Sequence, residues 1–190
     1  MKRPILKLVT GTDALPFDLA EIKSHLGIEY HERDDEIEAI IHTAVSKIDD
    51  DTGRAWIDQT WDYVLPKFPL NGEIRIPIAP LQSITSVKYY DIAGTLQTLS
   101  TDNYYVTAPS VTDQGWIQAV NFIFPIAQIY RPDAVTVRFV AGNTQEIEPT
   151  YIHLVKLWCG ALWANKEGQQ PKDMMAIQNL TWQLTQKGYC

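Results

Sequence analysis

The chain has 190 residues, of which 45% are hydrophobic and 21% charged, proportions that are typical of a globular protein and exclude a disordered or fibrous one. No apolar run approaches the ~20 residues that a membrane span requires, and the N-terminus lacks the hydrophobic segment of a secretion signal. We therefore expect one folded domain that neither crosses nor enters a membrane.

The acidic residues are concentrated near the N-terminus. Residues 1–60 carry 7 basic and 13 acidic side chains, whereas residues 61–190 carry 9 and 10. A protein that grips nucleic acid through its phosphates needs clustered Lys and Arg, and the sequence has no such cluster. Tight binding of nucleic acid is not expected.

The two cysteines, Cys159 and Cys190, do not form the spaced framework of a disulfide-stabilised domain or a zinc site. This usage favours synthesis in a reducing compartment.

Two helices are predicted before residue 54. Asp18 and Glu21 form a variant of the capping box, and Gly27 ends the apolar pattern that follows, which predicts a helix over about 18–26. A second helix is predicted over 34–53 because apolar residues recur at helical spacing and Gly53 suits a C-cap. Its apolar stripe consists of Ile37, Ile40, Ile41, Ala44, Val45 and Ile48.

Acidic residues lie at both ends of the second predicted helix. Asp34, Asp35 and Glu36 suit the positive N-terminal end of the helix dipole, whereas the triplet 49–51 opposes the dipole at the other end. We interpret the triplet as a solvated acidic rim, since consecutive residues lack the ligand spacing of a calcium loop.

The region 60–142 changes to a period of two and is predicted to be β-rich. Alternation is clearest in Ile84–Tyr89 and Val135–Phe139, which favours antiparallel strands. The expected strand runs are 61–65, 74–76, 84–90, 104–106, 116–124 and 135–140, separated by Pro, Gly, Asn and Asp. The fold class predicted is α+β: a helical bundle with a central antiparallel β-rich insertion.

A third long helix is predicted over 149–166, beginning at Pro149. Lys156 is the only charged residue in 151–164, so the helix must be buried on more than one side, by its own domain or by a neighbouring subunit. Its large apolar residues Trp158, Leu162 and Trp163 are therefore candidates for a subunit interface.

A linker-like stretch at 167–172 precedes a C-terminal segment that the pattern predicts as either a helix or a docking tail. The boundaries expected are a single domain over 1–170 and a tail over 171–190. Five apolar residues of this tail are candidates for docking on a partner: Met174, Ile177, Leu180, Trp182 and Leu184.

No motif whose spacing enforces a mechanism is present: the sequence has no Gly-rich phosphate loop, HExxH, GxSxG or paired CxxC. The four histidines, His25, His31, His42 and His153, are interpreted as ordinary side chains rather than a hydrolytic metal site built with Glu38 or the triplet 49–51. We expect no enzymatic activity and no cofactor.

A series of turns and strand starts resembles the head-tail connector family of long-tailed bacteriophages, whose members are also called adaptors. The similarity extends over about residues 16–167. It is carried by Asp51-Thr52-Gly53-Arg54, Gln59-Thr60-Trp61, Phe68-Pro69, Ile74-Arg75-Ile76-Pro77, Pro80-Leu81-Gln82-Ser83-Ile84, Tyr89, Asp91, Gly94, Tyr105, Arg131-Pro132-Asp133-Ala134-Val135, Ala141-Gly142, Pro149 and Trp163-Ala164-Asn165-Lys166-Glu167.

The resemblance implies a structural virion protein, made in the host cytoplasm and located in the neck of a phage, a prophage particle or a gene transfer agent. Such proteins form a ring, typically of twelve subunits, between the portal and a stopper or tail-completion protein, and DNA passes through the ring. Acidic side chains in the lumen would repel phosphates. Asp34, Asp35 and Glu38 are the candidates for that role or for contact with a partner, and the tail would reach the portal.

Two other readings remain open at this stage. A receptor- or carbohydrate-binding virion module would use aromatic residues of the β-rich region. A metal-dependent hydrolase would use the histidines and acidic residues named above.

Overall fold

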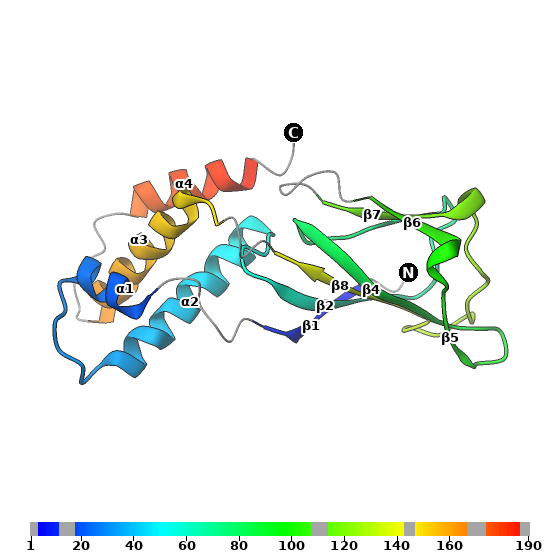
Figure 1. Ribbon diagram of the computed structural model, residues 1–190, viewed down its shortest axis with the longest axis horizontal. Helices are drawn as coiled ribbons and strands as arrows, with labels where there is room; N and C mark the ends of the chain where they lie inside the picture. Colours follow the sequence, from blue (N-terminus) through cyan, green and yellow to red (C-terminus); the bar gives the residue numbers. More distant parts are fainter. Residues whose placement is uncertain (1–3, 12–17, 108–113, 143–146, 167–173, 187–190) are drawn as a thin grey trace. The chain divides into compact units, whose positions relative to one another are not determined.

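The computed structural model describes residues 4–11, 18–107, 114–142, 147–166 and 174–186, and the chain forms two compact units. One unit is helical and spans Ala14–Trp56 and Thr144–Cys190. The other is built of strands and spans Met1–Asp13 and Ile57–Asn143. Figure 1 shows both units: β1 precedes the first helix, and the other strands of the β unit lie between the second and third helices along the chain. The predicted α+β class is confirmed.

The described part of the helical unit contains four α-helices: α1 (Leu19–Leu26), α2 (Asp34–Thr52), α3 (Pro149–Lys166) and α4 (Met174–Gln186). The first three begin and end within one residue of the ranges expected from the sequence. α2 packs against α3 and α4, while α1 contacts α2 and α3. The segment for which a helix or a tail remained open is helical over α4. The expected linker at 167–172 and residues 171–173 and 187–190 of the expected tail lie outside the described residues.

Local signals in the sequence account for the ends of the first two helices. The Asp18 carboxylate accepts a hydrogen bond from the backbone N–H of Ala20 at 3.1 Å. Gly27 and Gly53 both adopt a left-handed conformation, with φ of 71° and 64°, that glycine reaches without steric cost. Gly53 donates its N–H to the carbonyl oxygen of Asp49 at 2.9 Å and so ends α2.

The apolar character of α3 is explained within the chain, because α1, α2 and α4 all contact it. Tyr151, Leu154, Val155 and Cys159 are completely buried. Burial raises the pKa of the Cys159 thiol to about 12, so the thiol stays protonated and behaves as a small apolar group. The need for burial on more than one side is therefore met without a neighbouring subunit.

The β unit consists of two antiparallel sheets. The larger has the order β1-β2-β8-β4-β5, and the smaller has the order β3-β7-β6. Their strands are β1 (Ile5–Thr10), β2 (Gln59–Leu65), β3 (Glu73–Arg75), β4 (Leu81–Tyr90), β5 (Leu96–Thr98), β6 (Tyr104–Thr107), β7 (Trp116–Ala119) and β8 (Val135–Ala141). The central strand β8 pairs with β2 on one side and β4 on the other.

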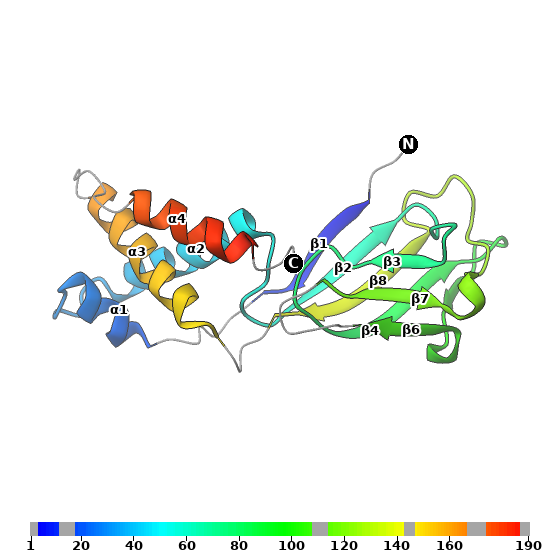
Figure 2. The same ribbon diagram turned by 90° about the horizontal axis from the view of Figure 1, so that it is seen from above.

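The two sheets lie in separate layers (Figures 1 and 2). The face of β8 that points between the layers carries Val135, Val137, Phe139 and Ala141, all completely buried. Thr136, Arg138 and Val140 occupy the opposite face and are partly accessible. The predicted alternation in β8 thus separates the core of the unit from its outer surface.

Two strands were not predicted, and one prediction was too long. β1 and β5 were not among the expected strands, although β1 pairs with β2 along most of its length and β5 pairs with β4. The expected strand 116–124 ends at Ala119, because Asn121 and Phe122 adopt left-handed φ values of 58° and 61° that no strand accommodates. Among the described residues, no helix is both long and apolar enough to cross a membrane.

The packing of α4 can be tested with one substitution. Ile177 is 1% exposed in the helical unit, so Ile177→Ala should lower the free energy of unfolding by about 2–5 kcal/mol. Chemical denaturation followed by circular dichroism measures this loss. The neighbouring Gln178→Ala, at an exposed position of the same helix, is the matched control and should change stability little. Equal stability of the two variants would show that α4 does not pack as described.

Candidate functional site

The three acidic candidates on α2 have different surroundings. Asp34 is only partly exposed and forms an ion pair with Lys23 of α1, with its Oδ1 2.5 Å from the Lys23 Nζ. Asp35 and Glu38 are exposed. Asp34 is therefore part of the internal structure of the helical unit, while the other two remain available.

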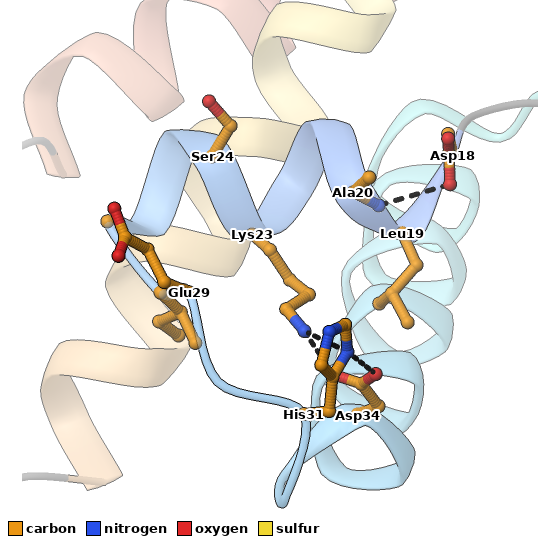
Figure 3. A pocket seen from close by; sticks show the side chains of 10 residues that line it. Asp18, Leu19, Ala20, Lys23, Ser24, Glu29, His31 and Asp34 are labelled. Carbon is orange, nitrogen blue, oxygen red and sulfur yellow. Dashed lines mark hydrogen bonds and ion pairs between the residues drawn. The ribbon is translucent and has the colours of Figure 1, made fainter.

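A groove of about 560 Å³ opens beside the Asp34 ion pair, between α1 and the start of α2 (Figure 3). Lys23 is 6% exposed and points across the groove toward His31 and Asp34, as the dashed contacts in Figure 3 show. The Nδ1 of His31 lies 3.2 Å from the Lys23 Nζ and 3.0 Å from the Asp34 Oδ2.

These contacts determine the protonation of Asp34. The hydrogen bond donated by Lys23, followed by the one from His31, lowers the pKa of the Asp34 carboxyl below its ordinary value of 3.8. The carboxylate consequently stays charged at neutral pH and neutralises a nearly buried ammonium. The cluster connects α1 to α2 and contains no activated nucleophile, so its chemistry is structural.

The acidic triplet at the end of α2 is spread over different environments. Asp49 is half-buried, Asp50 is exposed, and Asp51 accepts hydrogen bonds from Lys47 at 2.8 and 3.0 Å. Among the residues that the structure describes, no group of three His, Cys, Asp or Glu side chains is arranged to hold a metal ion.

The five apolar candidates of the C-terminal segment divide between the two faces of α4. Ile177 and Leu184 are 1% and 0% exposed and belong to the core of the helical unit, and Leu180 is half-buried. Met174 is 39% exposed and Trp182 65% exposed. Met175, which the sequence did not single out, is 77% exposed and joins them on the accessible side.

The three candidates for a subunit interface on α3 are less accessible than their size suggests. Trp163 is 8% exposed, with the guanidinium of Arg33 5.6 Å from its ring centre. Trp158 and Leu162 are half-buried, and the Trp158 ring lies 5.6 Å from the Lys47 ammonium. Trp163 packs inside its own unit, and only the exposed parts of Trp158 and Leu162 can contact another subunit.

The sequence did not single out seven strongly exposed apolar side chains of the β unit. They are Leu70, Ile92, Phe122, Ile123, Ile126, Ile129 and Tyr130, each 68–95% exposed. Two of them, Phe122 and Ile123, fell within the expected strand 116–124, so their apolar character was interpreted as part of a strand.

Comparison with known proteins shows which family the sequence is similar to. Residues 17–96 match the family model described as phage gp6-like head-tail connector protein. No curated protein sequence matches the chain.

Solved structures share the fold. A chain in the neck of an empty gene transfer agent particle, computed with six-fold symmetry, is 18% identical, with a TM-score of 0.79. A chain in the neck of the native particle, computed with twelve-fold symmetry, is 19% identical, with a TM-score of 0.76. Both matches cover 95% of this chain and 94% of the other. Residues 17–96 thus match the model of the gp6-like head-tail connector family, and the chain as a whole shares its fold with chains in the neck of gene transfer agent particles.

Proposed function

We propose that this protein is a structural virion protein, a head-tail connector subunit that forms a ring in the neck of a phage-like particle. The observation that carries this proposal is the shared fold with neck proteins over 95% of the chain, together with the family match over residues 17–96. That match includes α1, α2 and the strands β2, β3 and β4, so it draws on both units. The work of such a subunit is geometric, and it needs no reacting side chain.

The exposed acids of α2 fit the lining of a DNA channel. A channel that conducts DNA must not hold it, and carboxylates repel phosphates at short range. Asp35 and Glu38 are exposed and lie one turn apart on α2, so they present charge on neighbouring parts of its surface. Asp34 is excluded from this role because its charge is neutralised by Lys23.

The exposed side of α4 fits a docking surface for the portal. Met174, Met175 and Trp182 present flexible and aromatic apolar groups of the kind that anchor protein interfaces. The buried side of the same helix holds it on α2 and α3. Docking through one face of a packed helix costs less conformational entropy than docking through a free tail.

The connector role is tested by electron microscopy of the protein with the portal encoded beside it. We expect rings with a central hole, and Trp182→Ala should weaken portal binding about 30-fold, the effect of losing ~2 kcal/mol at an interface anchor. Tyr105→Ala is the control, because Tyr105 is similarly exposed, at 64% against 65%, but belongs to the β unit. Persistent monomers that ignore the portal would overturn the proposal, and binding to glycans instead would favour a receptor-binding module.

The acidic lining is tested by reversing its charge. The double variant Asp35→Lys, Glu38→Lys should fold and assemble normally but should hold DNA phosphates in the channel and slow DNA delivery. Gene transfer or infection per assembled particle measures the effect, and the isosteric Asp35→Asn, Glu38→Gln pair is the milder control. Unchanged delivery by the lysine variant would place these acids outside the lumen.

The structural role of Asp34 gives a prediction with a defined pH dependence. Its folded pKa is depressed, so its stabilisation is present above the unfolded value of 3.8 and is lost as the pH falls through the lower folded pKa. Asp34→Asn should lower the melting temperature at pH 7. Between pH 5 and pH ~2 the melting temperature of the variant should fall by less than that of the wild type, because the variant has no carboxylate to protonate at this position. Asp35→Asn is the matched control, and identical melting curves for both variants would contradict the assignment.

A further inference from the structure

Two loops of the β unit, one between β2 and β3 and one between β7 and β8, expose large apolar side chains. We name this surface the loop patch, and it consists of Leu70, Phe122, Ile123, Ile126, Ile129 and Tyr130, each at least 68% exposed. Exposure of this many large apolar groups in one region is unusual for a soluble monomer and marks an interaction surface.

The loop patch is held in one conformation by its anchors. Phe124 is 9% exposed and stacks on Phe68 with ring centres 4.6 Å apart. Farther along, the backbone N–H of Gln128 donates to the carbonyl oxygen of Tyr90 at 2.8 Å, and the guanidinium of Arg131 lies 3.3 Å from the centre of the Tyr90 ring. A surface that is already ordered loses little entropy when it binds.

The backbone of the loop between β7 and β8 is strained at three residues that are not glycine. Asn121, Phe122 and Tyr130 have φ values of 58°, 61° and 68°. Such conformations cost roughly 1–3 kcal/mol each and persist where the surrounding structure enforces them, often at functional surfaces. Gly72 provides the space, because a Cβ at this position would lie 2.4 Å from the carbonyl oxygen of Phe122.

A second apolar surface lies on a different part of the same unit. We name it the strand patch, and it consists of Leu6 and Leu8 of β1 with their cross-strand partners Tyr63 and Trp61 of β2. These residues share the sheet face that is completely buried at Val137 and Phe139, yet Leu6 and Leu8 are 38% and 45% exposed. The smaller sheet thus leaves this part of the face uncovered, at the edge where β1 runs in Figure 2.

The two patches are separated along the sheet. The loop patch precedes Val135, which pairs with Leu65 at the end of β2, whereas Leu8 pairs with Trp61, four residues earlier. Each copy of the chain therefore offers two distinct apolar surfaces within one compact unit.

We propose that the loop patch of one copy packs on the strand patch of the next copy around the ring. This inference rests on the proposed connector function. A cyclic assembly requires head-to-tail contacts, in which each subunit uses two different surfaces, and the neck structures with this fold were computed with six- and twelve-fold symmetry. The β unit offers one projecting and one flat apolar surface, as such a contact needs.

Cross-linking tests the contact directly. In a Cys190→Ser background, a chain carrying both Leu8→Cys and Ile126→Cys should give a ladder of covalent multimers with a short bis-maleimide, because each copy joins two neighbours. Chains with either single substitution should stay monomeric on a denaturing gel, and a mixture of the two should stop at dimers. Cys159 is completely buried and should not react.

The control pair replaces Leu8→Cys with Ser83→Cys, an exposed position on the opposite face of the same sheet. This pair should give no ladder. Dimers formed by Ile126→Cys alone would show that two loop patches meet each other, and they would overturn the proposal.

Charge variants provide a second readout. Leu8→Glu should reduce ring formation in electron micrographs at least tenfold while leaving the melting temperature within a few degrees, since the position is 45% exposed. Adding Ile126→Lys should restore part of the rings. Rings on the portal without the covalent ladder would overturn this contact and leave the connector function standing. A ladder without portal binding would support the contact and overturn the connector function.

Discussion

The packing of α2 on α3 is the constraint on which the rest of the helical unit depends. The chain leaves this unit after Trp56 and returns near Thr144, and every strand of the β unit except β1 lies between these two points. The two halves meet where the Trp56 ring stacks on Tyr151 at 4.9 Å, and Tyr151 is completely buried. Burial raises the pKa of the Tyr151 hydroxyl, with the charge of Asp49 as a smaller cause, so the ring stays neutral in the core.

This closure favours an insertion that is folded with its ends close together. Closing a flexible segment between two packed helices costs entropy that grows with its length, and a folded insertion with neighbouring ends avoids that cost. In the β unit the central strand β8 pairs with β2 and β4, so the first and last long strands of the insertion are neighbours. The two ends of the insertion therefore leave from one sheet, and the helices on either side can meet.

Local patterns in the sequence predicted the elements that local physics determines. The helical period of α2, the glycine caps at Gly27 and Gly53, and the alternation in β8 each depend on residues that are close in the chain. β1 escaped prediction because it is defined by pairing with β2, more than fifty residues later. Pairing at that separation leaves no mark in a window of ten residues.

The candidate site residues also divide into those that local sequence patterns predict and those that depend on residues far apart in the chain. On α4, Ile177 and Leu184 lie seven residues apart and share a face, whereas Trp182 lies about 140° from Ile177 around the helix. The helical period of the sequence therefore distinguishes the buried side chains of α4 from the exposed ones. The ion pair of Asp34 with Lys23 joins two helices and could not be read from the sequence. The loop patch was hidden for a third reason, since its strained backbone ends a strand that propensity alone would continue.

An assembly subunit must expose apolar surface and still stay soluble before it meets its partners. The chain carries a net charge of −7, and its exposed acids on α2 lie in a different unit from the apolar loop patch. Like charges repel at long range and slow random encounters, while apolar contact acts only at short range and in the correct orientation. The negative charge of the helical unit therefore opposes random aggregation, while the apolar surfaces of the β unit stay available for the ordered contacts proposed above.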